Sequence, residues 1–293
     1  MAHPASYNDG QPNSWNMSIE LWYSEGGIEI FGNTIMGPVD LAGGYTKKGD
    51  YAFAADIHDN VIGPAALQTN PEYGLYAERV QEGPVYVRNN TFRNVATAVA
   101  VYPSIVDTVA NLYIVGNIID PLAVSKSTDY AIGIEWSNIT SEFGTTVNNI
   151  NVANNVFNGG ENAWMGMKLP NIGNATGVTV RNNIFQGFGY APIFGNMTAG
   201  TDVSIDTLSI ENNVFWNNVE HNDPVIEVLV PTNSVIQNNI DNADPLFVSA
   251  SDFHLRSGSP GIDAGLALPY YSVDHEGVAV QNPPNIGCFE TTH

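Results

Sequence analysis

The chain carries a short pattern of alternating apolar and polar positions that closes on an asparagine and recurs over most of its length. In residues 28–33, for example, Ile28 and Ile30 are separated by Glu29, and Asn33 closes the copy. An apolar residue at every second position is typical of a β-strand, and further apolar residues after the asparagine indicate a second strand beyond a bend. The eight copies end at Asn33, Asn60, Asn90, Asn117, Asn155, Asn183, Asn213 and Asn239.

The spacing of these copies indicates a solenoid. Successive closing asparagines are 27, 30, 27, 38, 28, 30 and 26 residues apart. A repeat of about 20 to 50 residues is typical of a solenoid or repeat array, and no helical spacing separates the strands. The pattern therefore predicts an all-β fold, a single-stranded right-handed parallel β-helix of about 8–9 coils.

The closing asparagines are expected to connect the coils. Asparagine tolerates left-handed backbone angles at a bend, and its amide can hydrogen-bond an equivalent asparagine one coil away. We therefore predict that these residues adopt the left-handed conformation themselves and form an internal ladder.

A second strand is expected in each coil, some way after its asparagine. The segments that fit are residues 73–78, 97–102, 132–136, 165–169, 191–194 and 225–229, with residues 18–22 as an earlier version. We align them with Leu75, Val101, Ile134, Met167, Ile193 and Ile226 inward. The outward neighbours then form a row of Tyr76, Tyr102, Glu135, Lys168, Phe194 and Glu227.

This outward row is chemically unusual for the chain, because it contains one of only nine basic residues among carboxylates and aromatic rings. Successive coils lie about 4.8 Å apart, which would make Glu135 and Lys168 neighbours. They could form a cross-strand ion pair on a solvated sheet, or a lysine with a shifted pKa in a cleft. Aromatic rings suit sugar rings, so the row is a candidate glycan site, to which Glu78, Arg79 and Trp136 would also contribute.

Two regions are predicted along the chain. Residues 1–243 would form the coils, with residues 1–22 as an N-terminal cap or first coil, and residues 244–293 would form an irregular C-terminal cap. The last coil of a solenoid exposes unpaired strand edges and apolar interior. The C-terminal segment is therefore expected to cover that open end.

Charge and composition exclude several classes of function. Nine basic against thirty acidic residues give a net charge of −21, which repels nucleic acid and anionic membrane surfaces. No apolar run reaches the roughly 18 residues of a membrane-spanning helix, so we expect no membrane insertion. Cys288, the one cysteine, cannot form an internal disulfide, so burial and hydrogen bonds must hold the fold.

The C-terminal segment resembles the closing segment of secreted bacterial β-helix proteins of the pectate-lyase-like superfamily. The residues that carry the resemblance are Asp244-Pro-Leu-Phe247, Ser259-Pro-Gly-Ile-Asp-Ala-Gly265 and Ile286-Gly-Cys-Phe-Glu290. The resemblance implies a secreted or cell-surface protein whose partner is a polysaccharide or oligosaccharide, and we expect its signal peptide to have been removed. Lyases, hydrolases, epimerases and binding proteins share this fold, so the fold does not choose among them.

Polysaccharide lysis by β-elimination on a uronate is the leading activity that the resemblance implies. Lys168 would then be the base, Tyr102 or Tyr76 the proton donor, and Arg79 or a Ca²⁺ held by Glu135 would neutralise the uronate carboxylate. The charge of −21 opposes a polyuronate substrate, so Ca²⁺ or a locally basic cleft would be required.

Two alternatives remain open at this point. A glycoside hydrolase would need a carboxylate pair, for which Glu78 with Glu135 has a workable separation, whereas Glu135 and Glu227 lie too far apart. A binding or adhesive module would hold glycan on the aromatic row without cleaving it. His58, His221, His254 and His275 show no metal-ligand spacing, so the sequence predicts no metal site built from histidines.

Overall fold

The structure is a computed structural model of the chain. It describes residues 18–22, 27–42, 54–65, 73–77, 83–101, 108–120, 130–134, 146–160, 163–169, 174–196, 204–227 and 233–291. All regular secondary structure in these ranges is β. None of their segments forms a helix with the length and apolar character needed to cross a membrane.

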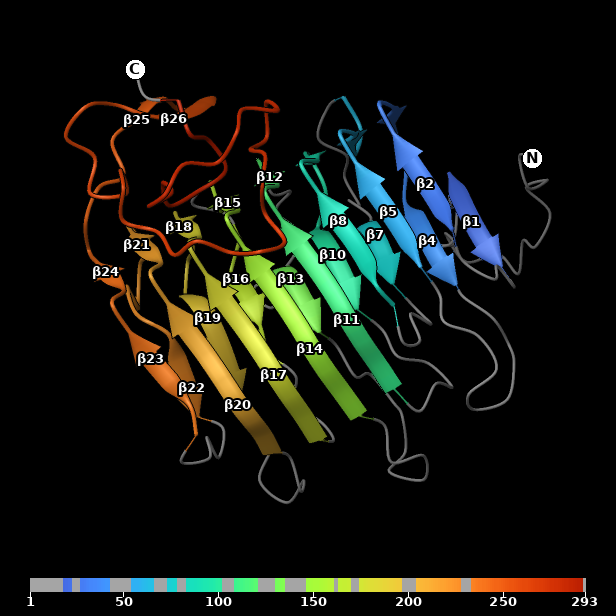
Figure 1. Cartoon of the computed structure of the whole chain (residues 1–293), viewed down its shortest axis with the longest axis horizontal. Coiled ribbons are helices and arrows are strands. Elements are labelled where there is room, and N and C mark those ends of the chain that lie inside the picture. The colour runs from blue at the N-terminus through green and yellow to red at the C-terminus, as the bar shows by residue number, and fades with distance from the viewer. Residues whose placement is uncertain are drawn as a thin grey trace.

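Three parallel sheets of eight strands each make up the body of the protein (Figure 1). Sheet A contains β1(Ile19–Trp22), β4(Val39–Ala42), β7(Tyr73–Ala77), β10(Thr97–Val101), β13(Tyr130–Ile134), β16(Met165–Lys168), β19(Ala191–Asn196) and β22(Val225–Glu227). Sheet B contains β2(Ile28–Phe31), β5(Ala55–His58), β8(Val85–Arg88), β11(Thr108–Val115), β14(Thr146–Ala153), β17(Asn174–Arg181), β20(Ser204–Glu211) and β23(Val235–Gln237). Sheet C contains β3(Thr34–Ile35), β6(Val61–Ile62), β9(Thr91–Phe92), β12(Ile118–Ile119), β15(Val156–Asn158), β18(Ile184–Gln186), β21(Val214–Trp216) and β24(Ile240–Asp241).

The chain runs through sheets B, C and A in turn within each coil, and each strand pairs in parallel with the same strand of the next coil. All eight asparagine copies supply one strand to sheet B, so the prediction of a right-handed parallel β-helix is confirmed. Sheet A also contains β4, which the sequence pattern did not indicate. The interior is apolar, with a column of phenylalanines under sheet C in which the rings of Phe157 and Phe185 stack 4.3 Å apart.

The predicted asparagine ladder is present along the whole solenoid. In each of seven successive steps the Nδ2 of one asparagine donates to the Oδ1 of the next, at distances between 2.9 and 3.2 Å. The same Oδ1 accepts the backbone N–H of the preceding asparagine, as from Asn90 to Asn117 at 2.9 Å. Asn90, Asn117, Asn155, Asn183 and Asn213 are fully buried, so these bonds satisfy polar groups that water cannot reach.

The left-handed residue at each bend differs from the prediction. Positive φ occurs at the residue immediately before each ladder asparagine, and the ladder residues themselves do not have it. The ladder residue needs its own side chain inside the coil, whereas the residue before it can turn outward. The left-handed residues, here called the bend column, are Gly32, Asp59, Asn89, Gly116, Asn154, Asn182, Asn212 and Asn238.

The register of sheet A corrects the predicted outward row. Leu75 pairs with Val99 and not with Val101, and Met167 pairs with Ile132 and not with Ile134, whereas the predicted pairing of Val101 with Ile134 is present. The row is thus Tyr76, Ala100, Gly133, Lys168, Phe194 and Val225. A shift of two residues keeps every side chain on the same face, so the alternating pattern alone could not detect it.

The C-terminal segment is irregular apart from the antiparallel pair β25(Phe247–Ser249) and β26(Asp252–Leu255), and it lies along the side of the solenoid (Figure 1). Phe253, Leu255 and Phe289 pack on apolar residues of sheet C that face outward. We expected this segment to cover the end of the last coil. At that end, Ile236 of β23 remains 48% exposed, although its register partner Ile210 is fully buried. The C-terminal segment packs instead on the apolar outer face of sheet C.

Candidate functional site

The outward face of sheet B carries two columns of side chains, and each successive strand contributes one residue to each column. The first column runs through Glu29, Asp56, Tyr86, Tyr113, Asn151, Thr179 and Ser209. The second column runs through Phe31, His58, Arg88, Val115, Ala153, Arg181 and Glu211. Because the strands are in register, side chains far apart in the sequence are held at neighbouring positions without any loop.

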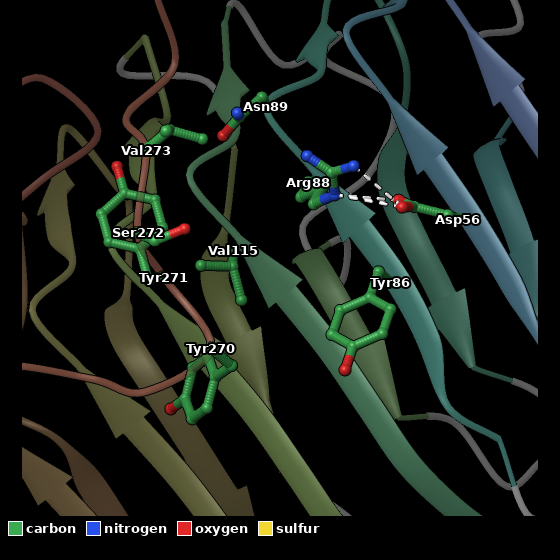
Figure 2. Close-up of a pocket in the computed structure, with 9 residues that line it drawn as sticks. All are labelled: Asp56, Tyr86, Arg88, Asn89, Val115, Tyr270, Tyr271, Ser272 and Val273. Atoms are coloured by element: carbon green, nitrogen blue, oxygen red, sulfur yellow. Dashed lines mark hydrogen bonds and ion pairs between the residues drawn. The ribbon is translucent and has the colours of Figure 1, made fainter. Parts of the chain in front are cut away.

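A cleft of about 380 Å³ opens between these columns and residues 270–273 of the C-terminal segment (Figure 2). Its floor comes from β5, β8 and β11, and its opposite wall is the C-terminal segment where it crosses sheet B. The described residues that line it are Asp56, Tyr86, Arg88, Asn89, Val115, Tyr270, Tyr271, Ser272 and Val273.

Tyrosine rings form one side of the cleft. Tyr86 stacks on Tyr113 with ring centroids 4.8 Å apart, and Tyr270 lies against Tyr113 at 5.1 Å in a tilted arrangement. Burial is the main cause that raises the pKa of both Tyr86 and Tyr270 above 10.0, so both hydroxyls are protonated at neutral pH. The hydroxyl of Tyr270 is itself buried, so the hydroxyl of Tyr86 is the one of the two that can donate to a ligand. The cleft therefore offers flat apolar faces with polar edges.

An ion pair between Arg88 and Asp56 forms the polar side of the cleft (Figure 2). Arg88 Nη2 donates to Asp56 Oδ2 at 2.8 Å, and Arg88 Nε donates to Asp56 Oδ1 at 3.0 Å. This two-point arrangement fixes both side chains in one plane and leaves other donors and acceptors of the pair for a ligand. Their charges cancel, so the cleft itself carries no strong net charge.

His58 lies beside this ion pair in a cluster of charged groups. Its Nε2 is 3.1 Å from Glu29 Oε1 and its Nδ1 is 2.7 Å from Asp59 Oδ2, while its ring stacks on Phe31. Burial lowers the pKa of His58, but the hydrogen bonds with Asp59 and Glu29 together outweigh it and raise that pKa above 6.5. Potential ligand atoms of Glu29, Asp56 and His58 all lie within 4.8 Å of one another, although the sequence showed no metal-ligand spacing.

Three of the predicted site residues have described side chains, and all three belong to the corrected row on sheet A. Tyr76 is buried and contacts the ring of Tyr73, whereas Lys168 and Phe194 are half-buried register partners. Glu227 pairs with Asn196 and so lies two positions beyond the row. The predictions for Tyr102, Glu135, Glu78, Arg79 and Trp136 lie outside the described residues.

Next to Lys168, sheet A carries a series of aromatic rings that the sequence pattern did not indicate. Trp164 and Tyr190 occupy equivalent positions in adjacent coils and stack at 5.2 Å with nearly parallel planes. Tyr190 also meets His221 and Phe194 edge to face, at 5.2 and 5.5 Å. Since Phe194 pairs with Lys168, the rings and the amine share one surface.

The sheet B cleft was missed although part of its signal lies in the repeat itself. The second and fourth residues of each copy, such as Asp56 and His58 or Tyr86 and Arg88, stack into the two columns. The sequence pattern indicates a structural role for these copies and directs the search for chemistry to the second strand of each coil. The wall formed by Tyr270 has no such signal, because it depends on how the C-terminal segment folds back.

Comparison with family models, with curated proteins and with solved structures gave no match to this chain.

Proposed function

We propose that this protein binds a neutral polysaccharide or oligosaccharide in the cleft on sheet B. The observation that carries the proposal is the combination, in one cleft, of the Tyr86 and Tyr270 rings with the planar Arg88–Asp56 pair. A sugar ring presents an apolar face and a rim of hydroxyls. Aromatic faces cover the first and a fixed array of donors and acceptors matches the second.

Charge favours a neutral glycan. Arg88 is the one cationic residue among the described lining residues, and Asp56 already neutralises it. The whole chain carries −21, so a polyanion would be repelled at long range and would find no unpaired cation in this lining.

The described lining of this cleft contains one carboxylate, which favours glycan binding without cleavage. Retaining glycosidases place two carboxyl groups about 5 Å apart and inverting ones about 6.5 to 9.5 Å apart, on opposite sides of the scissile bond. Among the described lining residues Asp56 alone has a carboxylate, and Arg88 holds it in two hydrogen bonds. Glu29, the register partner of Asp56, lies outside this lining.

Glycan arrays and calorimetry with neutral and uronate-containing oligosaccharides test the proposal. Tyr86→Ala removes a stacking face and should weaken binding of a neutral glycan about tenfold, which corresponds to about 1.4 kcal/mol. Tyr190→Ala, on the other surface, is the matched control and should bind as the wild type does. If Tyr190→Ala lost binding and Tyr86→Ala kept it, the glycan site would lie on sheet A and the proposal would be wrong.

Uronate lysis on sheet A is a second candidate, favoured by the position of Lys168 beside Phe194 and the rings of Trp164 and Tyr190. In this candidate Lys168 removes the C5 proton of a uronate stacked on the rings. The partners that the sequence suggests for it are Tyr102 or Tyr76 as proton donor, and Arg79 or Ca²⁺ as neutraliser.

An assay for unsaturated uronate separates this candidate from binding. Alginate and pectate, with and without Ca²⁺, would give the ultraviolet absorbance of the unsaturated product, and Lys168→Ala would abolish it. New reducing ends without that absorbance would instead indicate a hydrolase. Full lyase activity in Lys168→Ala would remove this assignment.

We also propose that the protein belongs to the pectate-lyase-like superfamily and is secreted or located at the cell surface. Both are supported by the resemblance of residues 244–290 to the closing segment of that superfamily and by the parallel β-helix fold. Detection of the protein in culture medium or on intact cells, against a cytoplasmic marker, tests the location.

A further inference from the structure

We propose that Glu29, Asp56 and His58 form a binding site for a divalent transition-metal ion of the zinc type on the outward face of sheet B. Glu29 and Asp56 are register partners on β2 and β5, and His58 follows Asp56 by two positions on the same face. One potential ligand atom from each residue lies within 4.8 Å of the other two. Two paired strands therefore supply all three ligands on a fixed backbone.

The distance between His58 and Glu29 is close to the one that such an ion requires. Zinc binds nitrogen and oxygen ligands at about 2.0 to 2.2 Å in a tetrahedron, which places the ligand atoms about 3.3 to 3.6 Å apart. His58 Nε2 and Glu29 Oε1 are 3.1 Å apart. A side-chain movement of a few tenths of an ångström at the exposed Glu29 would open that edge to the required length.

The imidazole of His58 is already held in the orientation that a ligand needs. Its ring stacks on Phe31 at 5.1 Å with an interplanar angle of 5°, and Asp59 Oδ2 lies 2.7 Å from Nδ1. A carboxylate on the second ring nitrogen is the usual support behind a metal-binding histidine, since it fixes the tautomer and makes the other nitrogen a stronger ligand. That other nitrogen, Nε2, is the one directed at Glu29.

Asp56 can bind the ion without releasing Arg88. A carboxylate has about four lone-pair positions, and the two main hydrogen bonds from Arg88 use one on each oxygen, so one on each oxygen is left for the ion. His58 must be neutral to bind a metal, and Glu29, Asp56 and Asp59 then bring three negative charges against one positive charge on Arg88. A divalent cation would bring this local net charge closer to zero.

The donor set selects the class of metal. One imidazole nitrogen with two carboxylate oxygens suits zinc and its neighbours, whereas Ca²⁺ and Mg²⁺ prefer six or more ligands that are all oxygen. Three protein ligands leave a fourth tetrahedral position for water.

Isothermal titration of the untagged full-length protein with ZnCl₂ tests this site. One ion per chain is expected to bind. Glu29→Gln and His58→Gln should each weaken that binding by at least about tenfold, since even loss of a supporting residue costs about 10- to 100-fold. Glu211→Gln is the matched control, because Glu211 pairs with Arg181 on the same face and should leave zinc affinity unchanged.

Asp59→Asn supplies a variant that keeps the fold. Asparagine occupies the same left-handed position in five other coils, so the substitution should leave thermal unfolding without metal unchanged and weaken zinc binding about tenfold. Visible absorption of the Co²⁺-loaded protein gives a second signal, and the bands of four-coordinate Co²⁺ should be lost in His58→Gln. Absence of zinc binding, wild-type affinity in both Glu29→Gln and His58→Gln, or stronger binding of Ca²⁺ than of Zn²⁺ would overturn the proposal.

Discussion

Each bend of the solenoid contains two consecutive residues with different structural roles. The ladder residue turns its amide inward and bonds the next coil, while the preceding bend-column residue takes the left-handed conformation. At Asn154 φ is 52°, and Nδ2 donates to the carbonyls of Asn285 and Gly287 in the C-terminal segment. One residue thus supplies both a backbone conformation and an attachment point.

Substitutions of Asn154 will separate these two contributions. Asn154→Gly removes the hydrogen bonds but permits the positive φ, and it should lower the free energy of unfolding by about 1 to 3 kcal/mol. Asn154→Ala adds the cost of a left-handed Cβ and should lower it by a further 1 to 2 kcal/mol or so. Denaturant titration of both variants gives the difference, and equal stability of the two would show that the left-handed angle costs nothing here.

Position along the ladder should set the cost of removing its amide. Asn117 is fully buried and its Oδ1 accepts from both the N–H and the Nδ2 of Asn90, so Asn117→Ala leaves several buried groups unpaired. We expect a loss of about 3 to 5 kcal/mol. Asn33 is exposed at the first coil, and Asn33→Ala should cost less than about 1 kcal/mol.

Chemical denaturation of Asn117→Ala and Asn33→Ala provides this comparison under one set of conditions. A similar loss in both variants would mean that burial of the ladder does not determine its contribution.

The sequence predicted the ladder but not the neighbouring left-handed residue, for a physical reason. Copies such as Asn89-Asn90 and Asn154-Asn155 contain two asparagines, and asparagine tolerates both the bend and the ladder position. Gly32-Asn33 and Gly116-Asn117 held the decisive signal, because glycine cannot make the ladder bond and accepts positive φ readily. Comparing those copies with the others would have assigned the left-handed position correctly.

At the scale of elements, the C-terminal segment is attached to the coils through polar contacts as well as apolar packing. His275 Nδ1 lies 2.9 Å from the carbonyl oxygen of Gly116, and Asn89 Nδ2 donates to the carbonyl of Asp274. Burial lowers the pKa of His275 below 6.5, and the bond to Gly116 offsets this only in part. The imidazole is therefore neutral where the segment is docked.

Acid should weaken this docking. Because the unfolded chain binds the proton more readily, the free energy of unfolding is fully retained above 6.5, the ordinary pKa of histidine, and falls as the pH drops through the lower folded pKa. His275→Gln should show a smaller fall between about pH 7.5 and about pH 5 than the wild type. Denaturant titrations at both pH values measure the two slopes, and identical slopes would exclude His275 as the group responsible.

Strand positions were largely predictable from the sequence, but strand register and the cleft were not. The period of two in copies such as residues 28–33 identifies a strand and its inward face, yet it is unchanged when one strand slides by two residues. That is why Lys168 lies opposite Gly133 and not Glu135. The cleft depends on Tyr270 meeting Tyr113, a contact between residues remote in sequence that no local pattern encodes.

Across the whole molecule, stability should be highest in the middle of the stack. In a solenoid each coil contacts only its neighbours, so the end coils lack one interface. The strands β11, β14 and β17 each have eight residues and a partner on both sides, whereas β23 ends its sheet and is exposed along its length.

Hydrogen exchange followed by mass spectrometry will test this gradient. Amides of β11, β14 and β17 should exchange only by global unfolding, while those of β2 and β23 should exchange faster through opening of the ends. Uniform protection from β2 to β23 would instead indicate that the stack opens as one cooperative unit.

Attachment of the C-terminal segment to the bend column also constrains how the length of this protein can change in evolution. The segment contacts five successive coils, through Asn89, Gly116, Asn154, Asn182 and Asn212. Duplication or deletion of one repeat between the first and last of these would displace the partners of the segment by one coil, about 4.8 Å. A repeat inserted before Asn60 would leave every one of those contacts intact, so new coils are most readily accepted near the N-terminal end.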